Sequence, residues 1–93
     1  MIGVREKITS LPFVPENNGI ATFHFNNENS GSNYVSTRAS ITEDGQIIAR
    51  HTAYGGNNFE STISFPVIKG KEYDITDRVN CIFVDDGVSN YVH

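Results

Sequence analysis

The chain has 93 residues, a length that accommodates one domain with one modest hydrophobic core. Seven Lys and Arg against eleven Asp and Glu give a net charge of −4, which argues against nucleic-acid binding because that function requires a continuous basic patch. The single cysteine excludes an intrachain disulfide. No apolar run approaches the roughly 20 residues that span a bilayer, and the first residues lack the pattern of a signal peptide, so we expect no membrane insertion.

The first third of the chain predicts one clear strand. Residues 1–10 form either a first strand or a lead-in from a preceding segment, and residues 11–15 carry two prolines, which confines them to an edge or an extended connector. From Ile20 to Phe25, apolar residues alternate with others, as in a half-buried strand. Its apolar side is expected to carry Ala21, Phe23 and Phe25. The Asn-rich residues Asn26–Asn33 then read as a polar loop.

A hairpin is predicted in the middle of the chain. Tyr34–Thr42 and Ile47–Tyr54 are rich in β-forming residues and flank Asp44-Gly45, a dipeptide typical of a two-residue type I′ turn. This turn sets the register of the two strands. The predicted pairs are Glu43 with Gln46, Ile41 with Ile48, Ala39 with Arg50, Thr37 with Thr52, and Val35 with Tyr54.

The last third predicts several short strands separated by turns. In chain order these are a loop at Gly55–Asn58, an alternating strand from Phe59 that ends at Pro66, a turn at Lys69–Lys71, a strand from Tyr73, a strand with Val79, Cys81 and Phe83 on one face, a turn at Asp85–Gly87, and a short final strand within Val88–His93. The whole chain thus predicts seven or eight strands with turn signals roughly every ten residues, and no helix. That pattern is typical of an all-β sandwich or barrel.

Three segments resemble parts of a known architecture, and they occur in its order. Pro15–Phe23 looks like the entry strand of small jelly-roll domains, Ile41–Ile48 looks like their central hairpin, and Phe65–Lys71 looks like their late Phe-Pro-Val-x-Lys-Gly-Asp strand and turn, with Lys71 in place of the Asp. Over residues 11–84 the set resembles the C-terminal head domains of bacteriophage tail fibres and tailspikes, which are related in shape to the C1q and TNF jelly roll.

The resemblance implies a fold and an assembly. We expect one antiparallel, jelly-roll-like β-sandwich over residues 1–93, with residues 1–10 as an alternative lead-in from a preceding fibre segment. The resemblance also implies a homotrimer, located in the virion or outside the cell, that serves as a non-enzymatic receptor-binding or assembly head. A small sandwich without disulfides gains stability when three copies bury a shared apolar face.

The residues that could carry catalysis or bind a metal lie in sequence contexts that favour structural roles. Cys81 sits between apolar residues of a predicted strand, which favours a buried, inert thiol over a nucleophile. The adjacent carboxylates Asp85-Asp86 and Glu43-Asp44 lie at predicted turns, where Asp is expected for structural reasons. The three histidines have no zinc-ligand spacing, although His24 or His51 could meet its copies at a threefold axis. We therefore expect no enzyme activity and no cofactor.

Carbohydrate binding is the function that the loops favour. Sugar rings stack on aromatic faces, and amides hydrogen-bond to their hydroxyls. Tyrosines stand beside Asn-rich loops at three places, the third being Tyr91 beside Asn90. The candidate ligand-binding residues are Tyr54, Asn57, Asn58, Asn29, Asn33 and Tyr34. The competing interpretation is that these tyrosines cap the core beside turns.

The sequence thus predicts a head domain that recognises a cell-surface glycan through the loops Asn26–Asn33 and Gly55–Asn58. Two alternatives stay open. One is a trimerisation or capping domain without a ligand, and the other is a bacterial carbohydrate-binding or adhesin-like module.

Overall fold

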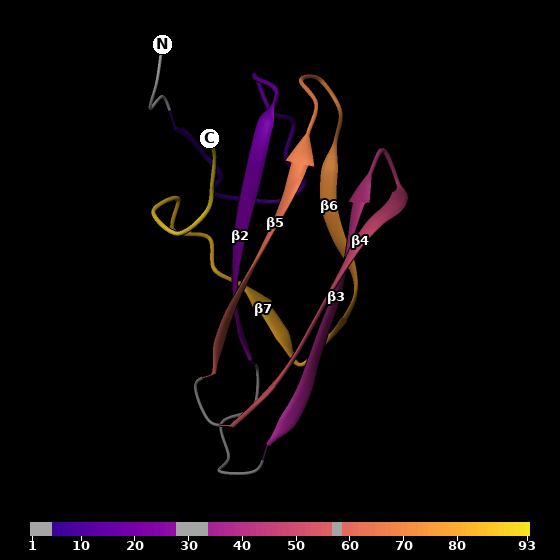
Figure 1. Cartoon of the computed structure of the whole chain (residues 1–93), viewed down its shortest axis with the longest axis vertical. Coiled ribbons are helices and arrows are strands. Elements are labelled where there is room, and N and C mark those ends of the chain that lie inside the picture. The colour runs from indigo at the N-terminus through magenta and orange to yellow at the C-terminus, as the bar shows by residue number, and fades with distance from the viewer. Residues whose placement is uncertain (1–4, 28–33, 57–58) are drawn as a thin grey trace.

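The computed structural model describes residues 5–27, 34–56 and 59–93, which form two antiparallel sheets packed as a sandwich (Figure 1). The larger sheet has the order β1 (Glu6–Lys7), β8 (Tyr91–Val92), β2 (Gly19–Asn27) and β5 (Glu60–Val67), with β7 (Cys81–Phe83) also paired to β2. The smaller sheet has the order β4 (Gln46–Gly55), β3 (Val35–Glu43) and β6 (Tyr73–Val79). The predicted antiparallel sandwich is confirmed. The described ranges contain no helix, and hence none that could cross a membrane.

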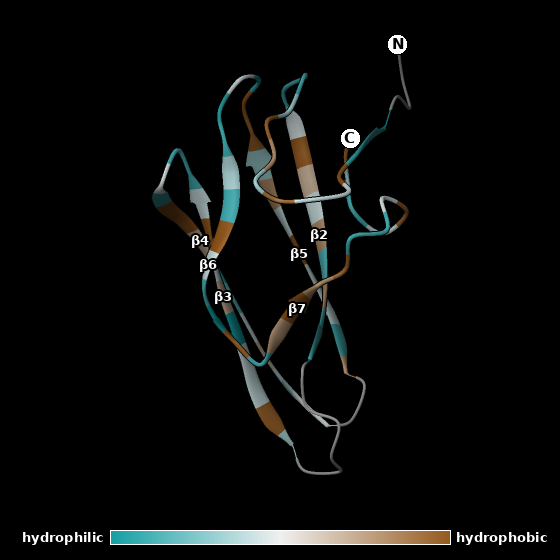
Figure 2. Ribbon diagram, turned by 180° about the vertical axis from the view of Figure 1, so that it is seen from behind, coloured by the Kyte–Doolittle hydropathy of each residue, from teal (hydrophilic) through white to brown (hydrophobic). Residues whose placement is uncertain are grey.

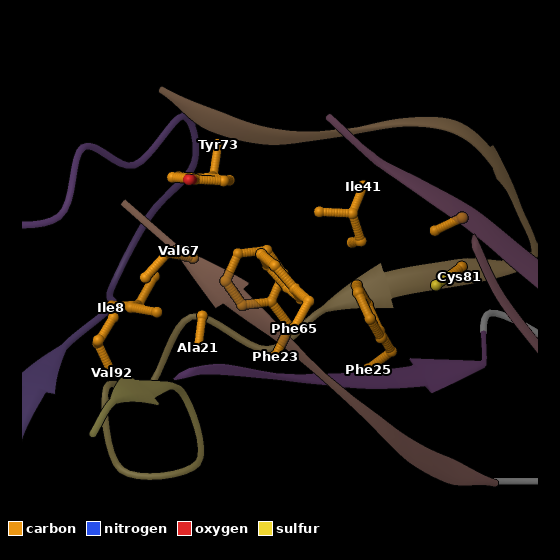
Figure 3. Close-up of a cluster of buried hydrophobic side chains, with 11 residues drawn as sticks. Ile8, Ala21, Phe23, Phe25, Ile41, Phe65, Val67, Tyr73, Cys81 and Val92 are labelled. Atoms are coloured by element: carbon orange, nitrogen blue, oxygen red, sulfur yellow. The ribbon is translucent and has the colours of Figure 1, made fainter. Parts of the chain in front are cut away.

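The core forms where the apolar side of β2 meets the smaller sheet. Ala21, Phe23 and Phe25 are buried as their alternation predicts, because successive side chains of a strand point to opposite faces. The ring of Phe23 packs edge-to-face on that of Phe65 from the neighbouring strand, with 4.8 Å between ring centroids. Figure 3 shows these two rings at the centre of the cluster, with Tyr73 and Ile41 across from them on the smaller sheet.

The β3–β4 hairpin has the predicted turn but a different register. Asp44 and Gly45 both have positive φ (49° and 85°), as a type I′ turn requires, and Glu43 pairs with Gln46. The predicted pairing of Ile41 with Ile48 is wrong, because Ile41 pairs with Ala49 and Thr42 with Ile47. Ile48 is therefore the extra residue of a β-bulge. Figure 2 shows this apolar stretch in brown directly after the hydrophilic turn.

The bulge shifts every later pair of the hairpin by one residue. Ala39 pairs with His51, Thr37 with Ala53 and Val35 with Gly55, where the predicted partners were Arg50, Thr52 and Tyr54. A shift of one residue exchanges the two faces of a strand. The bulge consequently places His51 on the core side of β4 and the three predicted partners on the solvent side.

Three element boundaries also differ from those predicted. Asn26 and Asn27 belong to β2 and not to the following loop. The strand β5 does not end at Pro66, which pairs with Ile20 and lies on an edge strand, where a missing backbone N–H is tolerated. Val79 does not share a face with Cys81, because it ends β6 in the smaller sheet whereas Cys81 begins β7 in the larger one.

A single residue carries the chain from one sheet to the other. Asn80 lies between β6 and β7 and has a φ of 51°, a left-handed conformation that Asn tolerates better than most residues. Its side-chain amide donates a 3.2 Å hydrogen bond to the carbonyl of Ser36 on β3. β6 and β7 thus form one nearly continuous segment that turns a corner of the sandwich.

Candidate functional site

The solvent-facing side of the smaller sheet carries the polar and aromatic residues of the hairpin, and we call it the outer face. Its rows are set by the shifted register, in which three residues of β3 pair directly with three of β4. The pairs are Ser36 with Tyr54, Arg38 with Thr52, and Ser40 with Arg50. Side chains of directly paired residues lie on the same side of a sheet. All six side chains therefore project from one surface.

Two tyrosines form an exposed pair at the end of this face. Tyr34 precedes β3 and Tyr54 lies near the end of β4, and their ring centroids are 5.5 Å apart with planes tilted by 48°. Each residue is 65% exposed, so neither ring serves to cap the core. A Cβ atom added to Gly56 would lie 3.2 Å from Cε1 of Tyr34, so the glycine allows the backbone to approach this ring closely. The pair therefore offers open aromatic surface at the end of the smaller sheet.

A shallow hollow begins at the second tyrosine and continues along the sheet. It has a volume of about 350 Å³ and is lined by Ser36, Arg38, Thr52, Ala53 and Tyr54. We call it the tyrosine hollow. It combines an aromatic ring with hydroxyl groups and a guanidinium group, which are the chemical groups that bind sugar rings and their hydroxyls.

A second hollow, of about 400 Å³, lies next to the first on the outer face. Its lining includes three arginines, Arg38, Arg50 and Arg78, together with the hydroxyl residues Ser40 and Thr52. We call it the arginine hollow. It shares Arg38 and Thr52 with the tyrosine hollow. The two hollows are therefore neighbours that one extended ligand could occupy together.

The arginine hollow was not predicted from the sequence, because the predicted register paired Arg50 with Ala39 on the same face as Ile41 and Ile48, which is the face expected to be apolar. One feature of the sequence could have revealed the hollow. In the predicted register the apolar face would also carry Arg50 and Thr52, and a one-residue bulge moves both residues to the opposite face. A second bulge completes the cluster: between the pairs Arg38–Val79 and Ser40–Thr76, β3 has one residue and β6 has two. The two residues are Asp77, with a φ of 53°, and Arg78. Bulges commonly redirect side chains in this way.

The structure describes only part of the predicted site. It brings Tyr34 and Tyr54 together, as reported above. Asn29, Asn33, Asn57 and Asn58 lie outside the described residues. At described positions next to them in the sequence, the side-chain amide of Asn27 donates to the carbonyl of Gly56, and the backbone N–H of Asn27 donates to the carbonyl of Phe59 at 2.9 Å. These bonds connect the end of β2 to the residues that flank the second loop.

The third tyrosine of the sequence analysis does not offer a comparable site. The guanidinium carbon of Arg5 lies 3.6 Å from the ring centroid of Tyr91 and covers that face of the ring. The neighbouring Asn90 is completely buried, donates to the carbonyl of Val84 and accepts a 2.5 Å hydrogen bond from the N–H of His24. Its amide is therefore engaged in holding the β7–β8 connection to β2.

Two of the carboxylates considered for catalysis, Asp86 and Asp44, have structural partners. Asp86 accepts hydrogen bonds from the N–H groups of Val88 (3.0 Å) and Ser89 (2.8 Å), and the bonds from Ser89 are the largest reason that the pKa of Asp86 is lowered. Asp44 accepts a 2.9 Å bond from the N–H of Glu72. Both acids thus stabilise turns, as expected.

Cys81 is buried, as predicted. Within the described ranges, no three His, Cys, Asp or Glu side chains meet in a group that could hold a metal ion.

Comparisons with protein-family models, with curated proteins and with solved structures found no match.

Proposed function

We propose that this domain is a non-enzymatic receptor-binding head, of the kind carried by phage tail fibres, and that it binds a cell-surface glycan on its outer face. The observation that carries the proposal is the exposed pair Tyr34–Tyr54, of which Tyr54 lines the tyrosine hollow. Two exposed aromatic rings 5.5 Å apart, from Tyr34 just before β3 and Tyr54 on β4, present a stacking surface, and tyrosine loses little conformational entropy on binding because it has only two side-chain torsions.

The groups beside the platform suit the rest of a sugar. Arg38, Thr52 and Ser36 line the same hollow as Tyr54 and supply hydrogen-bond donors and acceptors within reach of a stacked ring. An adhesin-like module would use the same chemistry, so the site chemistry does not depend on the parent protein being a fibre.

The proposal is tested with a glycan array followed by calorimetric titration of the best ligand. Tyr54→Ala should weaken binding by about five- to tenfold, because aromatic stacking contributes on the order of 1–1.5 kcal/mol. Tyr54→Phe should bind nearly as well as the unmodified domain, since it keeps the ring. Val88→Ala, at a 73% exposed position in the β7–β8 connection, is the matched control and should bind normally. Unchanged affinity in both Tyr34→Ala and Tyr54→Ala would refute this site.

A trimerisation or capping domain is the second candidate, and a group of exposed apolar side chains favours it. Val14, Ile20 and Ile68 are between 40% and 51% exposed, and the segments carrying the first and last are joined by a 3.1 Å hydrogen bond from the N–H of Gly70 to the carbonyl of Pro15. A shared apolar surface of this kind would be covered in a homotrimer. Sedimentation equilibrium decides this point: Val14→Ser with Ile68→Ser should shift a trimer towards monomers, whereas a monomeric unmodified domain would exclude this candidate.

A further inference from the structure

The arginines of the outer face are the largest concentration of positive charge in the described part of an acidic protein. Three of the seven Lys and Arg residues line one hollow, although the net charge of the chain is −4. All three arginines are exposed. Within residues 5–27, 34–56 and 59–93, the ion pairs are His24–Glu60 and Lys71–Glu43, so none of the three arginines belongs to one.

The register brings two of these arginines within reach of one ligand group. Arg38 pairs with Thr52 and Ser40 pairs with Arg50, so Arg38 and Arg50 are diagonal neighbours on the same face. Diagonal neighbours lie about 7–8 Å apart at the backbone, a spacing that long side chains can close. Two guanidinium groups can thus converge on one anion through paired N–H donors.

The other residues that line the arginine hollow determine its net charge. Ser40 is 5% exposed and forms a small, polar floor between larger neighbours. Arg78 lies on the edge strand β6 and also borders a separate hollow that Asp74 and Asp85 line. Its positive charge is therefore shared between two hollows, and we assign anion binding to Arg38 and Arg50. Asp77 adds one negative charge to the rim. Three positive charges against one negative leave the hollow cationic overall.

We infer that the glycan bound by this domain is acidic, with a carboxylate or sulfate group held by Arg38 and Arg50 while an adjoining sugar ring stacks on Tyr54. This inference rests on the proposed function, because the tyrosine hollow must hold the sugar. It follows from the continuity of the two hollows, which share Arg38 and Thr52. A neutral sugar would leave the guanidinium groups of the arginine hollow without a charged partner.

The test titrates the isotopically labelled domain with three hexasaccharides and follows the amide and arginine side-chain signals by NMR. The probes are maltohexaose, which is neutral, a polygalacturonate hexamer, which carries carboxylates, and a heparin-derived hexamer, which also carries sulfates. At least one acidic probe should bind about tenfold more tightly than maltohexaose, and its affinity should fall between about 50 and about 200 mM salt. The polygalacturonate and heparin arms distinguish a carboxylate from a sulfate.

Matched variants assign the effect to the arginine hollow. Arg38→Gln with Arg50→Gln should remove the preference for the acidic probe, and both residues are exposed, so the fold is expected to persist. Lys69→Gln with Arg5→Gln removes the same charge elsewhere and should keep the preference. Thermal unfolding of each variant verifies that the sandwich is intact.

The outcomes separate this inference from the proposed function. Equal affinity for neutral and acidic probes, with sensitivity to Tyr54→Ala, would overturn the acidic ligand and keep the glycan site. Acidic binding that survives loss of Arg38 and Arg50 would also overturn the inference. Acidic binding that needs the arginines but ignores Tyr54→Ala would overturn both, because it would describe an anion site without a stacked sugar.

Discussion

The imidazole of His51 stacks on the ring of Phe25 across the interior of the sandwich, with centroids 5.2 Å apart and planes tilted by 24°. Nε2 of His51 also shares a 2.7 Å hydrogen bond with Oγ of Ser61. These three residues come from β4, β2 and β5, so one side chain connects the two sheets. Burial of the ring disfavours its charged form and lowers the pKa of His51 below the usual 6.5.

Acid should therefore weaken the fold through His51. The unfolded chain takes up a proton on this histidine near pH 6.5, and the folded protein does so only at lower pH, so the free energy of unfolding falls as pH drops below about 6.5. The slope from this residue reaches at most about 1.4 kcal/mol per pH unit. Urea unfolding from pH 7.5 to 5 should show it. His51→Gln should flatten the dependence, whereas His93→Gln, at an exposed position, should keep it. An unaltered slope in His51→Gln would disprove this assignment.

Tyr73 should make the fold sensitive to high pH. Its hydroxyl is buried, donates a 2.6 Å hydrogen bond to Oε2 of Glu43 and accepts one of 2.8 Å from the N–H of Ile68. Burial and the Glu43 contact raise the pKa of Tyr73 to about 12. The unfolded chain loses this proton near pH 10, so the stabilisation is complete below that pH and declines as pH rises above it.

The variant Tyr73→Phe tests this directly. At pH 7 it should lower the free energy of unfolding by about 1–3 kcal/mol, because the carboxylate of Glu43 and the N–H of Ile68 each lose a partly buried hydrogen bond. It should also unfold with a weaker pH dependence between about pH 9.5 and 11.5. Tyr54→Phe, at a 65% exposed position, is the control and should match the unmodified domain in both respects. Equal curves for Tyr73→Phe and the unmodified domain would contradict the prediction.

Phe23 should be the most costly side chain to truncate. It is completely buried and contacts Phe25, Phe65 and Phe83 edge-to-face. Phe23→Ala should destabilise the domain by about 3–5 kcal/mol, since it removes apolar contacts and leaves a cavity. Ile82→Ala, at a 44% exposed position on β7, should cost less than about 1 kcal/mol. Chemical unfolding measures both, and similar losses in the two variants would mean that the core is placed wrongly.

Position 77, where Asp77 of the β6 bulge has a left-handed backbone conformation, should tolerate glycine but not a β-branched residue. Asp77 has a φ of 53°, which costs most residues about 1–2 kcal/mol. Asp77→Val should therefore destabilise the domain by about that amount, whereas Asp77→Gly should stay within about 1 kcal/mol. Thr76→Val, one position earlier and also exposed, should be neutral. Thermal unfolding compares the three, and an unaffected Asp77→Val would show that the bulge is not formed in solution.

The alternation of residues was sufficient to predict the core strands but not the outer face. Ala21, Phe23 and Phe25 have no competing arrangement, because only one face of β2 is apolar. The register of the hairpin was harder to predict, since Ile47 and Ile48 are adjacent and either could face the core opposite β3. The choice between a regular pair and a bulge depends on the sheet that the hairpin covers, which short-range patterns do not report. The tyrosine pair was therefore predicted as separate candidates, and the arginine hollow was missed.

The corner at Asn80 has a mechanical consequence for the sandwich. Along that side the two sheets are joined through the backbone, because β6 runs directly into β7. The edge strands β4 and β5 also belong to different sheets and follow one another in the chain, and the side chains of His51 and Ser61 link them by a 2.7 Å hydrogen bond. Acid should weaken the packing between β4 and β5 because burial disfavours the charged form of His51, whereas the turn at Asn80 between β6 and β7 contains no such group. Amide exchange on β4 and β5 should accelerate on mild acidification, relative to its pH-corrected intrinsic rate, before that on β6 and β7 changes.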